Sequence, residues 1–448
     1  VRPIGALVFG RLGDVIGRKN TFLLTLIIMG GSTFVMGLIP GYQHIGVAAP
    51  LLILFLRLLQ GLALGGEYGG AATYVAEHAP DHKRGLYTSW IQTTGTVGLL
   101  ASLGIIVLVR HALDPDQARS VEKFNEWGWR IPFLLSIILV AIAVYIRLKL
   151  QETPLFQRLK TEGKLSMNPL TESFGRKANL KIVLLALFGA TMGQGVIFSA
   201  SQLYAQNFLE TVCKLDFDQS KTMLLFAILL AAPFFVVFGS WSDRIGRKWI
   251  MMAGMLLASV TYPLLFRGLQ TIPDPQRRAE FKDQKEIVST MAFMGRTKDL
   301  IHTSSTIMHY EGGLTVTEDR KDTVYADGRA AAKPLVSVSR NVGTGDYWKM
   351  VGILFVMVFY VTMVYGPIAA FLVELFPTRI RYTSISLPYH LGNGTFGGMT
   401  PFMATLLTVM YPGHALAGLW YPIGVSVVCL VIGVLYIPRK RQLADFEN

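Results

Sequence analysis

Four polar side chains interrupt a long apolar stretch of the sequence: Arg57, Gln60, Glu67 and Tyr68. An ionisable side chain inside a bilayer costs about 2.5–3.5 kcal/mol, so such residues face the protein interior and mark paths for ions or solutes. Glu67 stands among four glycines, where a carboxylate could bind and release a proton. Arg57 and Tyr68 are eleven residues apart and share a helix face. Two alternatives stay open: Arg57 could extend to the membrane surface, and Glu67 could simply join two helices by a hydrogen bond.

A second set of polar residues falls in two later apolar stretches. Gln194 and Gln202 lie in one stretch, and His390 and Asn393 lie in the other. Polar groups at this density are costly in lipid, so they should line an aqueous path or form hydrogen bonds between helices. His390 is also a candidate for proton exchange, because imidazole is the side chain that titrates closest to neutral pH. We therefore group these residues with the four above as candidates for substrate contact or proton coupling.

The sequence carries no pattern for a metal site, a cofactor or an enzyme nucleophile. Its two cysteines, Cys213 and Cys429, stand far apart, and its eight histidines form no metal-binding motif. No arrangement of a nucleophile with a base stands out either. We therefore expect no enzyme activity, no cofactor and no bound metal.

Membrane-spanning helices must position these polar residues. Of the 448 residues, 52% are hydrophobic and only 16% are charged, and the mean hydropathy is +0.43. Soluble chains carry about 25% charged residues, so this composition excludes soluble enzymes and nucleic-acid-binding proteins. The net charge of +13 fits basic loops beside a membrane better than a nucleic-acid partner. The apolar runs predict one partial helix and ten full ones, over residues 3–13, 21–39, 50–76, 86–109, 131–149, 181–208, 220–241, 249–266, 349–374, 383–410 and 415–437.

Two polar segments divide this series of helices. Residues 150–180 are basic and fall near the middle, which predicts helix bundles at 1–149 and 181–448 joined by a linker. Residues 267–348 form an insertion with 12 Lys/Arg and 11 Asp/Glu, in which LTVTEDRKDTVYADG weakly resembles a hairpin. Lys and Arg number 21 in the loops and ends on the linker side and six in the short loops of the other side. This bias predicts a cytoplasmic linker and C-terminus, and an insertion outside the cytoplasm.

A ten-residue motif, GxxxDxxGRK, occurs twice. Each copy lies in a predicted cytoplasmic turn, where glycine permits a tight reversal, the acid can lie at a helix N-terminus and the basic residues face lipid headgroups. Two copies in matched positions indicate a parallel repeat of two helix bundles. We expect both copies to gate the cytoplasmic side through Gly10, Asp14, Gly17, Arg18, Gly239, Asp243, Arg244, Gly246 and Arg247.

At this repeat the chain resembles the major facilitator superfamily. Further stretches resemble its metabolite:H⁺ symporter family, which includes carriers of α-ketoglutarate, shikimate, citrate and proline/betaine. These stretches are RLLQGLALGGEYGG from Arg57, EHAP from Glu77, WGWRIP from Trp127, ETP from Glu152 and ELFPTRIRY from Glu374. The resemblance implies an all-α integral membrane fold of two six-helix bundles, of which helix 1 and part of helix 2 are missing from this sequence. It also implies that Arg57, four residues before Gly61, matches an arginine used by proton-coupled carriers.

The sequence therefore predicts a secondary active transporter, a multi-pass monomer of the cytoplasmic (inner) membrane. It would move a small organic acid or zwitterion together with a proton by alternating access. Its partners would be the metabolite, H⁺ and the lipid bilayer, with no nucleic acid. An uncoupled facilitator of the same fold is the first alternative. A membrane sensor that binds its ligand on the outer insertion is the second.

Overall fold

The first half of the chain folds into a group of long apolar helices. The computed structural model describes residues 1–448 except 115–118, 121–122, 282–284, 295–298, 325–333 and 438–448. A short helix, α3 (Tyr42–Ile45), connects two of the long ones. The long helices are α1 (Arg2–Val15), α2 (Arg18–Leu38), α4 (Ala48–His78), α5 (Arg84–Leu113) and α7 (Arg130–Lys149).

The second half contains helices of the same kind, and two of them are broken. The first is interrupted by two π-helical turns and runs through α9 (Lys177–Ala186), η4 (Leu187–Thr191), α10 (Met192–Ser199), η5 (Ala200–Tyr204) and α11 (Ala205–Thr211). The second is interrupted once and runs through α15 (Arg381–His390), η10 (Leu391–Gly397) and α16 (Gly398–Met410). The others are continuous: α12 (Phe217–Ile245), α13 (Arg247–Thr271), α14 (Thr344–Leu375) and α17 (Trp420–Tyr436).

The helical architecture predicted from the sequence is confirmed. Within the described residues, nine helices are long and apolar enough to cross a membrane. The partial run at 3–13 is the fourteen-residue α1, and the run at 383–410 is the broken helix α15–α16. Every predicted run lies within a few residues of an observed helix, because runs of this length must satisfy their backbone hydrogen bonds internally in lipid.

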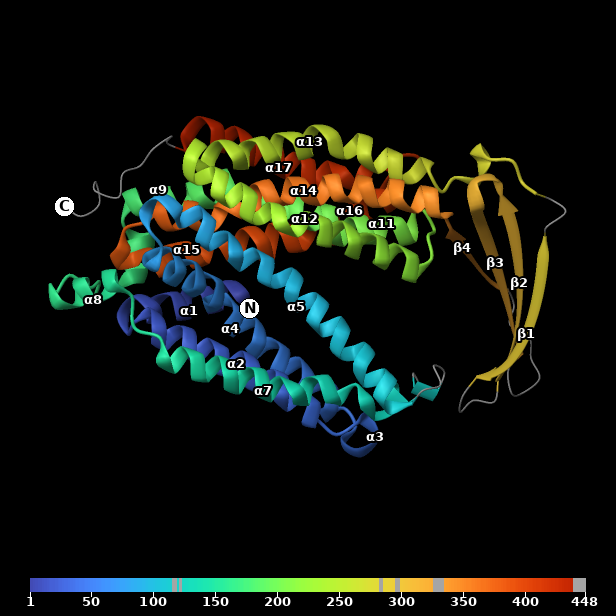
Figure 1. Ribbon diagram of the computed structural model, residues 1–448, viewed down its shortest axis with the longest axis horizontal. Helices are drawn as coiled ribbons and strands as arrows, with labels where there is room; N and C mark the ends of the chain where they lie inside the picture. The colour runs from blue at the N-terminus through green and yellow to red at the C-terminus, as the bar shows by residue number, and fades with distance from the viewer. Residues whose placement is uncertain (115–118, 121–122, 282–284, 295–298, 325–333, 438–448) are drawn as a thin grey trace.

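The two halves meet at one end of the bundle and separate toward the other. Figure 1 shows α2, α5 and α7 diverging from α12 and α14 toward the end where the sheet lies. At the opposite end, which we call the closed end, α1 packs against α15 and α5 packs against α12. The turn between α1 and α2, the turn between α12 and α13, and the short helix α8 (Pro154–Thr161) of the linker all lie at this closed end.

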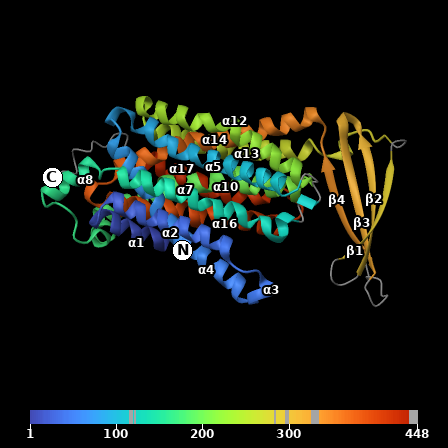
Figure 2. The same cartoon turned by 60° about the horizontal axis from the view of Figure 1, so that its bottom comes forward.

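The insertion forms a four-stranded antiparallel meander beyond the other end of the helices. Its strands are β1 (Glu286–Met294), β2 (Asp299–Tyr310), β3 (Leu314–Val324) and β4 (Leu335–Asn341), paired in that order. The stretch predicted as a hairpin forms β3, which pairs with β2, and its last four residues lie outside the described part of the chain. Both views show the strands beyond the ends of the helices (Figures 1 and 2). An otherwise helical fold therefore carries one sheet that the helix count alone did not predict.

The sheet is fixed to the second half. Arg340 of β4 donates its backbone N–H to the Lys214 carbonyl and accepts from the Asp216 N–H. The Gln219 side chain exchanges two hydrogen bonds of 2.9 Å with the backbone of Val342. Leu314 of β3 is fully buried in the same apolar core as the ends of the second-half helices that lie nearest the sheet. These contacts should make the sheet move with the second half as one body.

Candidate functional site

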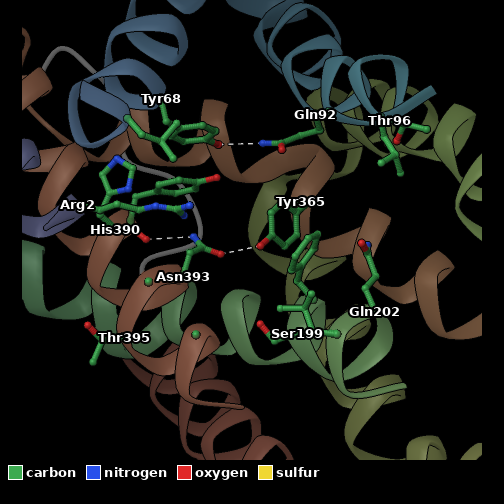
Figure 3. Close-up of a pocket in the computed structure, with 18 of the residues that line it drawn as sticks. Arg2, Tyr68, Gln92, Thr96, Ser199, Gln202, Tyr365, His390, Asn393 and Thr395 are labelled. Carbon is green, nitrogen blue, oxygen red and sulfur yellow. Dashed lines mark hydrogen bonds between the residues drawn. The ribbon is translucent and has the colours of Figure 1, made fainter. Parts of the chain in front are cut away.

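A cavity of about 890 Å³ lies between the two halves. Side chains of both halves point into it, as Figure 3 shows. The polar residues of its lining are Arg2, Tyr68, Gln92 and Thr96 from the first half, and Ser199, Gln202, Tyr365, Tyr389, His390, Asn393 and Thr395 from the second. The apolar part of the lining includes Leu64, Leu99, Phe198 and Phe235. A concave, mostly apolar site with a few convergent polar groups is the usual form of a small-molecule site.

The broken helices of the second half supply several of these polar groups. Gln202 lies in the π-helical turn η5, and Asn393 and Thr395 lie in η10. A π-helical turn inserts an extra residue and redirects the side chains that follow, and such turns occur frequently at functional sites. Gly392 allows the two broken helices to pack closely, because a Cβ at that position would lie 2.5 Å from the backbone carbon of Thr191. The breaks therefore bring polar side chains to the cavity without an exposed strand or loop.

A hydrogen-bond network centred on Asn393 fixes part of the cavity wall. The Tyr365 hydroxyl donates to the Asn393 Oδ1 at 2.6 Å. The Asn393 amide donates to the Tyr389 carbonyl at 3.0 Å and approaches the Gln194 Oε1 at 3.5 Å. Among the described residues, the buried His390 Nε2 and Gln194 Nε2 have no hydrogen-bond partner. Because unpaired buried polar atoms are costly, the Nε2 of His390, which belongs to the cavity lining, is available to a substrate or to water.

Two tyrosines from opposite halves stack beside the cavity. The rings of Tyr68 on α4 and Tyr389 on α15 are nearly parallel, with centroids 3.5 Å apart and an interplanar angle of 4°. The Gln92 amide of α5 donates to the Tyr68 hydroxyl at 3.0 Å and so orients that ring (Figure 3). The stack joins the two halves between the cavity and the closed end, so separating the halves there must break it.

The charged side chain in the described lining of the cavity is positive. Arg2 is the only Lys, Arg, Asp or Glu among the described residues that line it. Tyrosine, glutamine, asparagine and histidine provide the rest of the polar surface. A guanidinium with no acid beside it in the cavity wall favours a ligand with a carboxylate or another anionic group.

The closed end is held by two aspartates that cap helices of the opposite half. The Asp14 carboxylate accepts backbone N–H groups of Tyr382 and Thr383, at 3.2 and 2.8 Å, at the start of α15. The Asp243 carboxylate accepts those of Gly85 and Leu86, at 2.8 and 2.9 Å, at the start of α5. A helix N-terminus carries unpaired N–H groups and partial positive charge, so a carboxylate there is stabilising. The two caps are related by the repeat and fasten each half to the other.

Buried ion pairs surround both caps. Glu77, at the end of α4, accepts from Arg381 at 2.7 Å and lies 3.2 Å from the Arg18 guanidinium. Arg18 also donates to the Thr378 carbonyl at 2.7 Å and lies 3.9 Å from Asp14. With two acids and two bases, the cluster of Asp14, Arg18, Glu77 and Arg381 is formally neutral. Because all four are buried, removing one leaves the others without compensation.

The second copy of the motif makes the corresponding pairs within its own half. Arg247 lies 2.9 Å from Asp243 and also forms a bidentate pair with Glu374 of α14. Its neighbour Lys248 donates to the Val434 and Ile437 carbonyls, at 2.8 and 2.5 Å, at the end of α17. Lysine at a helix C-terminus is electrostatically favourable.

The motif glycines allow the helices to approach at the closed end. A Cβ at Gly10 would lie 2.9 Å from the Cα of Thr383, and one at Gly239 would lie 2.4 Å from the Cβ of Ser89. Gly17 and Gly246 end the turns with φ of +122° and +96°, which only glycine adopts without strain.

Comparison with known proteins identifies this arrangement. Residues 1–172 match the family described as sugar (and other) transporters. A putative metabolite transport protein of Haemophilus influenzae is 30% identical over 456 residues, which cover 98% of this chain and 82% of the relative. The chain belongs to the major facilitator superfamily.

Other relatives and solved structures agree with this family. The inner membrane metabolite transport protein YhjE of Escherichia coli is 28% identical, with 99% of this chain and 83% of the relative covered. A proline/betaine transporter of Salmonella typhimurium is 34% identical over 278 residues, covering 59% of this chain and 53% of the relative. The proton:xylose symporter XylE, with 15% identity over 100% of this chain and 87% of that one, has the same fold at a TM-score of 0.63. The E. coli fucose:proton symporter FucP has a TM-score of 0.56 and 12% identity, with 99% of this chain and 88% of that one covered.

The structure divides the predicted site residues of this family member into two groups. Tyr68, Gln202, His390 and Asn393 line the cavity, and Gln194 lies behind Asn393. The other three predicted residues, Arg57, Gln60 and Glu67, lie outside the lining, and their roles in coupling stay predictions.

Arg57, Gln60 and Glu67 do not line the cavity. Arg57 is exposed. Gln60 donates to the Thr33 hydroxyl of α2 at 2.7 Å, and Glu67 lies 3.9 Å from the Arg147 guanidinium of α7. Gln60 and Glu67 therefore join α4 to its neighbours within the first half, the structural alternative that the sequence left open for Glu67.

All the predicted gating residues lie at the closed end, where most of them make the contacts described above. Arg244 is exposed there, and Arg247 makes its ion pairs within its own half. The position of Arg244 in the second copy corresponds to Val15 in the first, so the repeat does not require a charge there.

A second repeat, not recognised in the sequence, supplies the partners of the motif. The pattern E-x-x-P-x-x-x-R runs from Glu77 to Arg84 and again from Glu374 to Arg381. In both copies the glutamate ends one long helix and the arginine begins the next. A search for matched acid–proline–base spacing in the two halves would have found it.

Proposed function

We propose that this member of the superfamily is a symporter that moves a small organic anion or zwitterion together with a proton. The observation that carries the proposal is the cavity between two halves that two equivalent Asp–helix caps hold together at one end. Breaking both caps and both buried ion-pair clusters would open this end, and the diverging ends would then approach each other. Alternating access of this kind is rigid-body motion of one half against the other around a fixed site.

The chemistry of the cavity supports the substrate class. Arg2 would bind a carboxylate, and the stacked rings of Tyr68 and Tyr389 together with Tyr365 offer faces to a cationic or apolar group. A zwitterion would use both, and some relatives are named proline/betaine transporters. The described residues of the cavity lining include no acid, which argues against a simple cation as substrate.

We propose that the closed end is cytoplasmic and that the sheet lies outside the cytoplasm. The excess of Lys and Arg on the linker side supports this orientation, because positive loops remain in the cytoplasm. A relative named as an inner membrane protein supports the same membrane. The C-terminus would then be cytoplasmic, residues 1–149 and 181–448 would be the two moving bodies, and 267–348 would travel with the second. We take the chain to act as a monomer, because each cap and each cluster is complete within one copy.

Proton coupling is the part of the proposal that most needs a direct test. The candidates are Glu67, His390 and Arg57, and solved symporters with this fold are named as proton-coupled. Purified protein in proteoliposomes should accumulate organic acids or betaines when the lumen is more alkaline than the medium, and a protonophore should abolish accumulation. Uptake that equilibrates but never exceeds the external concentration, with or without the protonophore, would favour the uncoupled facilitator. Saturable binding to the isolated protein without any flux would favour the sensor.

A further inference from the structure

A groove of about 430 Å³ lies on the outer surface of the second half, apart from the central cavity. It runs between α9 with the following turn η4 and the end of α17. Leu180, Leu184, Leu185 and Phe188 form one wall, and Ile432 and Tyr436 form the other. Leu184 and Tyr436 are 43% and 63% exposed, so the groove opens outward instead of into the bundle.

Two lysines stand at one end of this groove. Lys177 and Lys181 belong to its lining and are exposed. They are one turn apart on α9, on the same face as Leu184, Leu185 and Phe188, so charge and apolar surface are continuous along one helix face. Tyr436 lies at the same end, and tyrosine is enriched where a bilayer meets water.

The local charges leave this end of the groove electropositive. Lys177 is the first residue of α9, and the first turn of that helix holds no acid, although helix N-termini favour negative charge. Glu172 is the nearest acid in sequence, but Arg379 holds it at 2.5 Å and Arg176 at 3.4 Å. Within the part of the chain that the structure describes, neither lysine forms an ion pair or a side-chain hydrogen bond. An anion at this point would balance charge that the protein itself does not balance.

We propose that this groove binds an anionic glycerophospholipid. Its phosphate would lie between Lys177 and Lys181, and one acyl chain would lie along Leu180, Leu184, Phe188 and Ile432. The occupant is a lipid and not free phosphate, because most of the groove is apolar and faces the hydrocarbon. The lipid carries a net negative charge, because each lysine attracts an anionic headgroup electrostatically. A zwitterionic headgroup has no net charge and is attracted less. The site lies at the junction of the linker and α9, so the lipid would steady the start of the second half.

Native mass spectrometry of the full chain in detergent can count bound lipids directly. Dioleoyl phosphatidylglycerol and dioleoyl phosphatidylcholine are the two probes, titrated separately. We expect one phosphatidylglycerol to bind more tightly than phosphatidylcholine. Loss of each lysine should weaken phosphatidylglycerol binding by about fivefold. The double variant Lys177→Gln/Lys181→Gln should therefore bind phosphatidylglycerol about 25-fold more weakly, while its affinity for phosphatidylcholine stays the same.

Two further variants separate charge from shape. Lys83→Gln/Lys160→Gln removes two exposed lysines that lie near the same end of the bundle but outside the groove, and it should change neither affinity. Leu184→Trp fills the groove without changing charge and should weaken both lipids, while the thermal unfolding midpoint shows whether the variant is folded. Equal affinities for the two lipids, or equal losses in the two double-lysine variants, would overturn the proposal. Competition by millimolar glycerol phosphate would also overturn it, because the site would then bind the headgroup alone.

Discussion

The carboxylate of Glu77 accepts a 2.7 Å hydrogen bond from the Arg381 guanidinium across the interface of the two halves. For the equivalent arginine of the first half, Arg84, the described part of the chain shows no ion pair across this interface. Arg84 donates to the Ala76 carbonyl at 3.1 Å and lies 2.7 Å from Asp81, both in its own half. The repeat explains the difference, because the second copy has Thr378 at the position of Asp81. Among the described residues, the closed end is therefore asymmetric, because the pair of Glu77 with Arg381 crosses between the halves and its counterpart does not.

Arg381 and Arg84 should consequently differ as gate residues. Arg381→Ala breaks a buried pair, which costs roughly 3–5 kcal/mol, and the cost falls mainly on the closed state. Arg84→Ala loses a pair with an exposed partner, worth about 0–1 kcal/mol, and one backbone hydrogen bond. A cysteine at Ser89, which is buried against Gly239, reports opening through its reaction rate with maleimide. Labelling should accelerate strongly in Arg381→Ala and only slightly in Arg84→Ala; equal rates would contradict the asymmetry.

The two capping aspartates should contribute to the closed state independently. Asp14→Asn and Asp243→Asn keep the shape of the side chain but lose its charge at a helix N-terminus, at a cost of about 1–3 kcal/mol each. Both variants should reach the membrane and transport more slowly. The double variant should show nearly the sum of the two effects, since the caps share no partner. Normal uptake at normal expression in either single variant would remove that aspartate from the gate.

Gly239 should be intolerant of a methyl group for a steric reason alone. A Cβ there would meet the Ser89 Cβ at 2.4 Å and the Gly85 carbonyl at 2.7 Å, so α12 and α5 could not close. Gly239→Ala should favour the open arrangement and slow uptake, although alanine is the better helix former. Gly104→Ala, where nothing lies within 4 Å of the added Cβ, is the matched control on α5. Substrate counterflow measured on both variants tests the difference, and equal rates would refute it.

Coupling can be assigned by comparing Glu67 with its ion-pair partner. If Glu67 carries the proton, Glu67→Gln should retain counterflow and lose the dependence of uptake on a pH gradient. Arg147→Gln should then retain that dependence. If the pair at 3.9 Å only joins α4 to α7, both variants should lose rate equally at every pH. Arg57→Ala should abolish gradient-driven accumulation, and uptake that survives in Arg57→Ala and Glu67→Gln would leave His390 as the next candidate.

The orientation of the sheet can be read from single cysteines. Burial raises the pKa of the Cys213 thiol to about 12, and Cys429 is fully buried, so both native thiols should react slowly. A cysteine at the exposed Lys321 of β3 should react with an impermeant maleimide in intact cells. One at Lys164 in the linker should react only after lysis. The reverse pattern would invert the proposed topology.

The sequence alone determined the helical part of this protein. The thickness of a bilayer sets the length of an apolar run, so the spans could be predicted to within a few residues at each end. The glycines and aspartates of the repeated motif predicted two matched turns, because such residues suit a tight reversal beside a helix N-terminus. The family followed from the same stretches.

Only the tertiary structure decided which polar residues face the cavity and which partners meet across the halves. Glu67 and Tyr68 are neighbours, yet a helix turns about 100° between them, so one joins α7 and the other stacks on Tyr389. Apolar periodicity cannot tell which face of a buried helix meets which partner, because every face is apolar in a membrane bundle. Asp14 and Thr383 are 369 residues apart, and their contact exists only when the two halves close. The sheet was only weakly indicated, because the one stretch that resembled a hairpin supplies β3 alone, and Arg340, Gln219 and Leu314, which fix the sheet, contact residues far away in the chain.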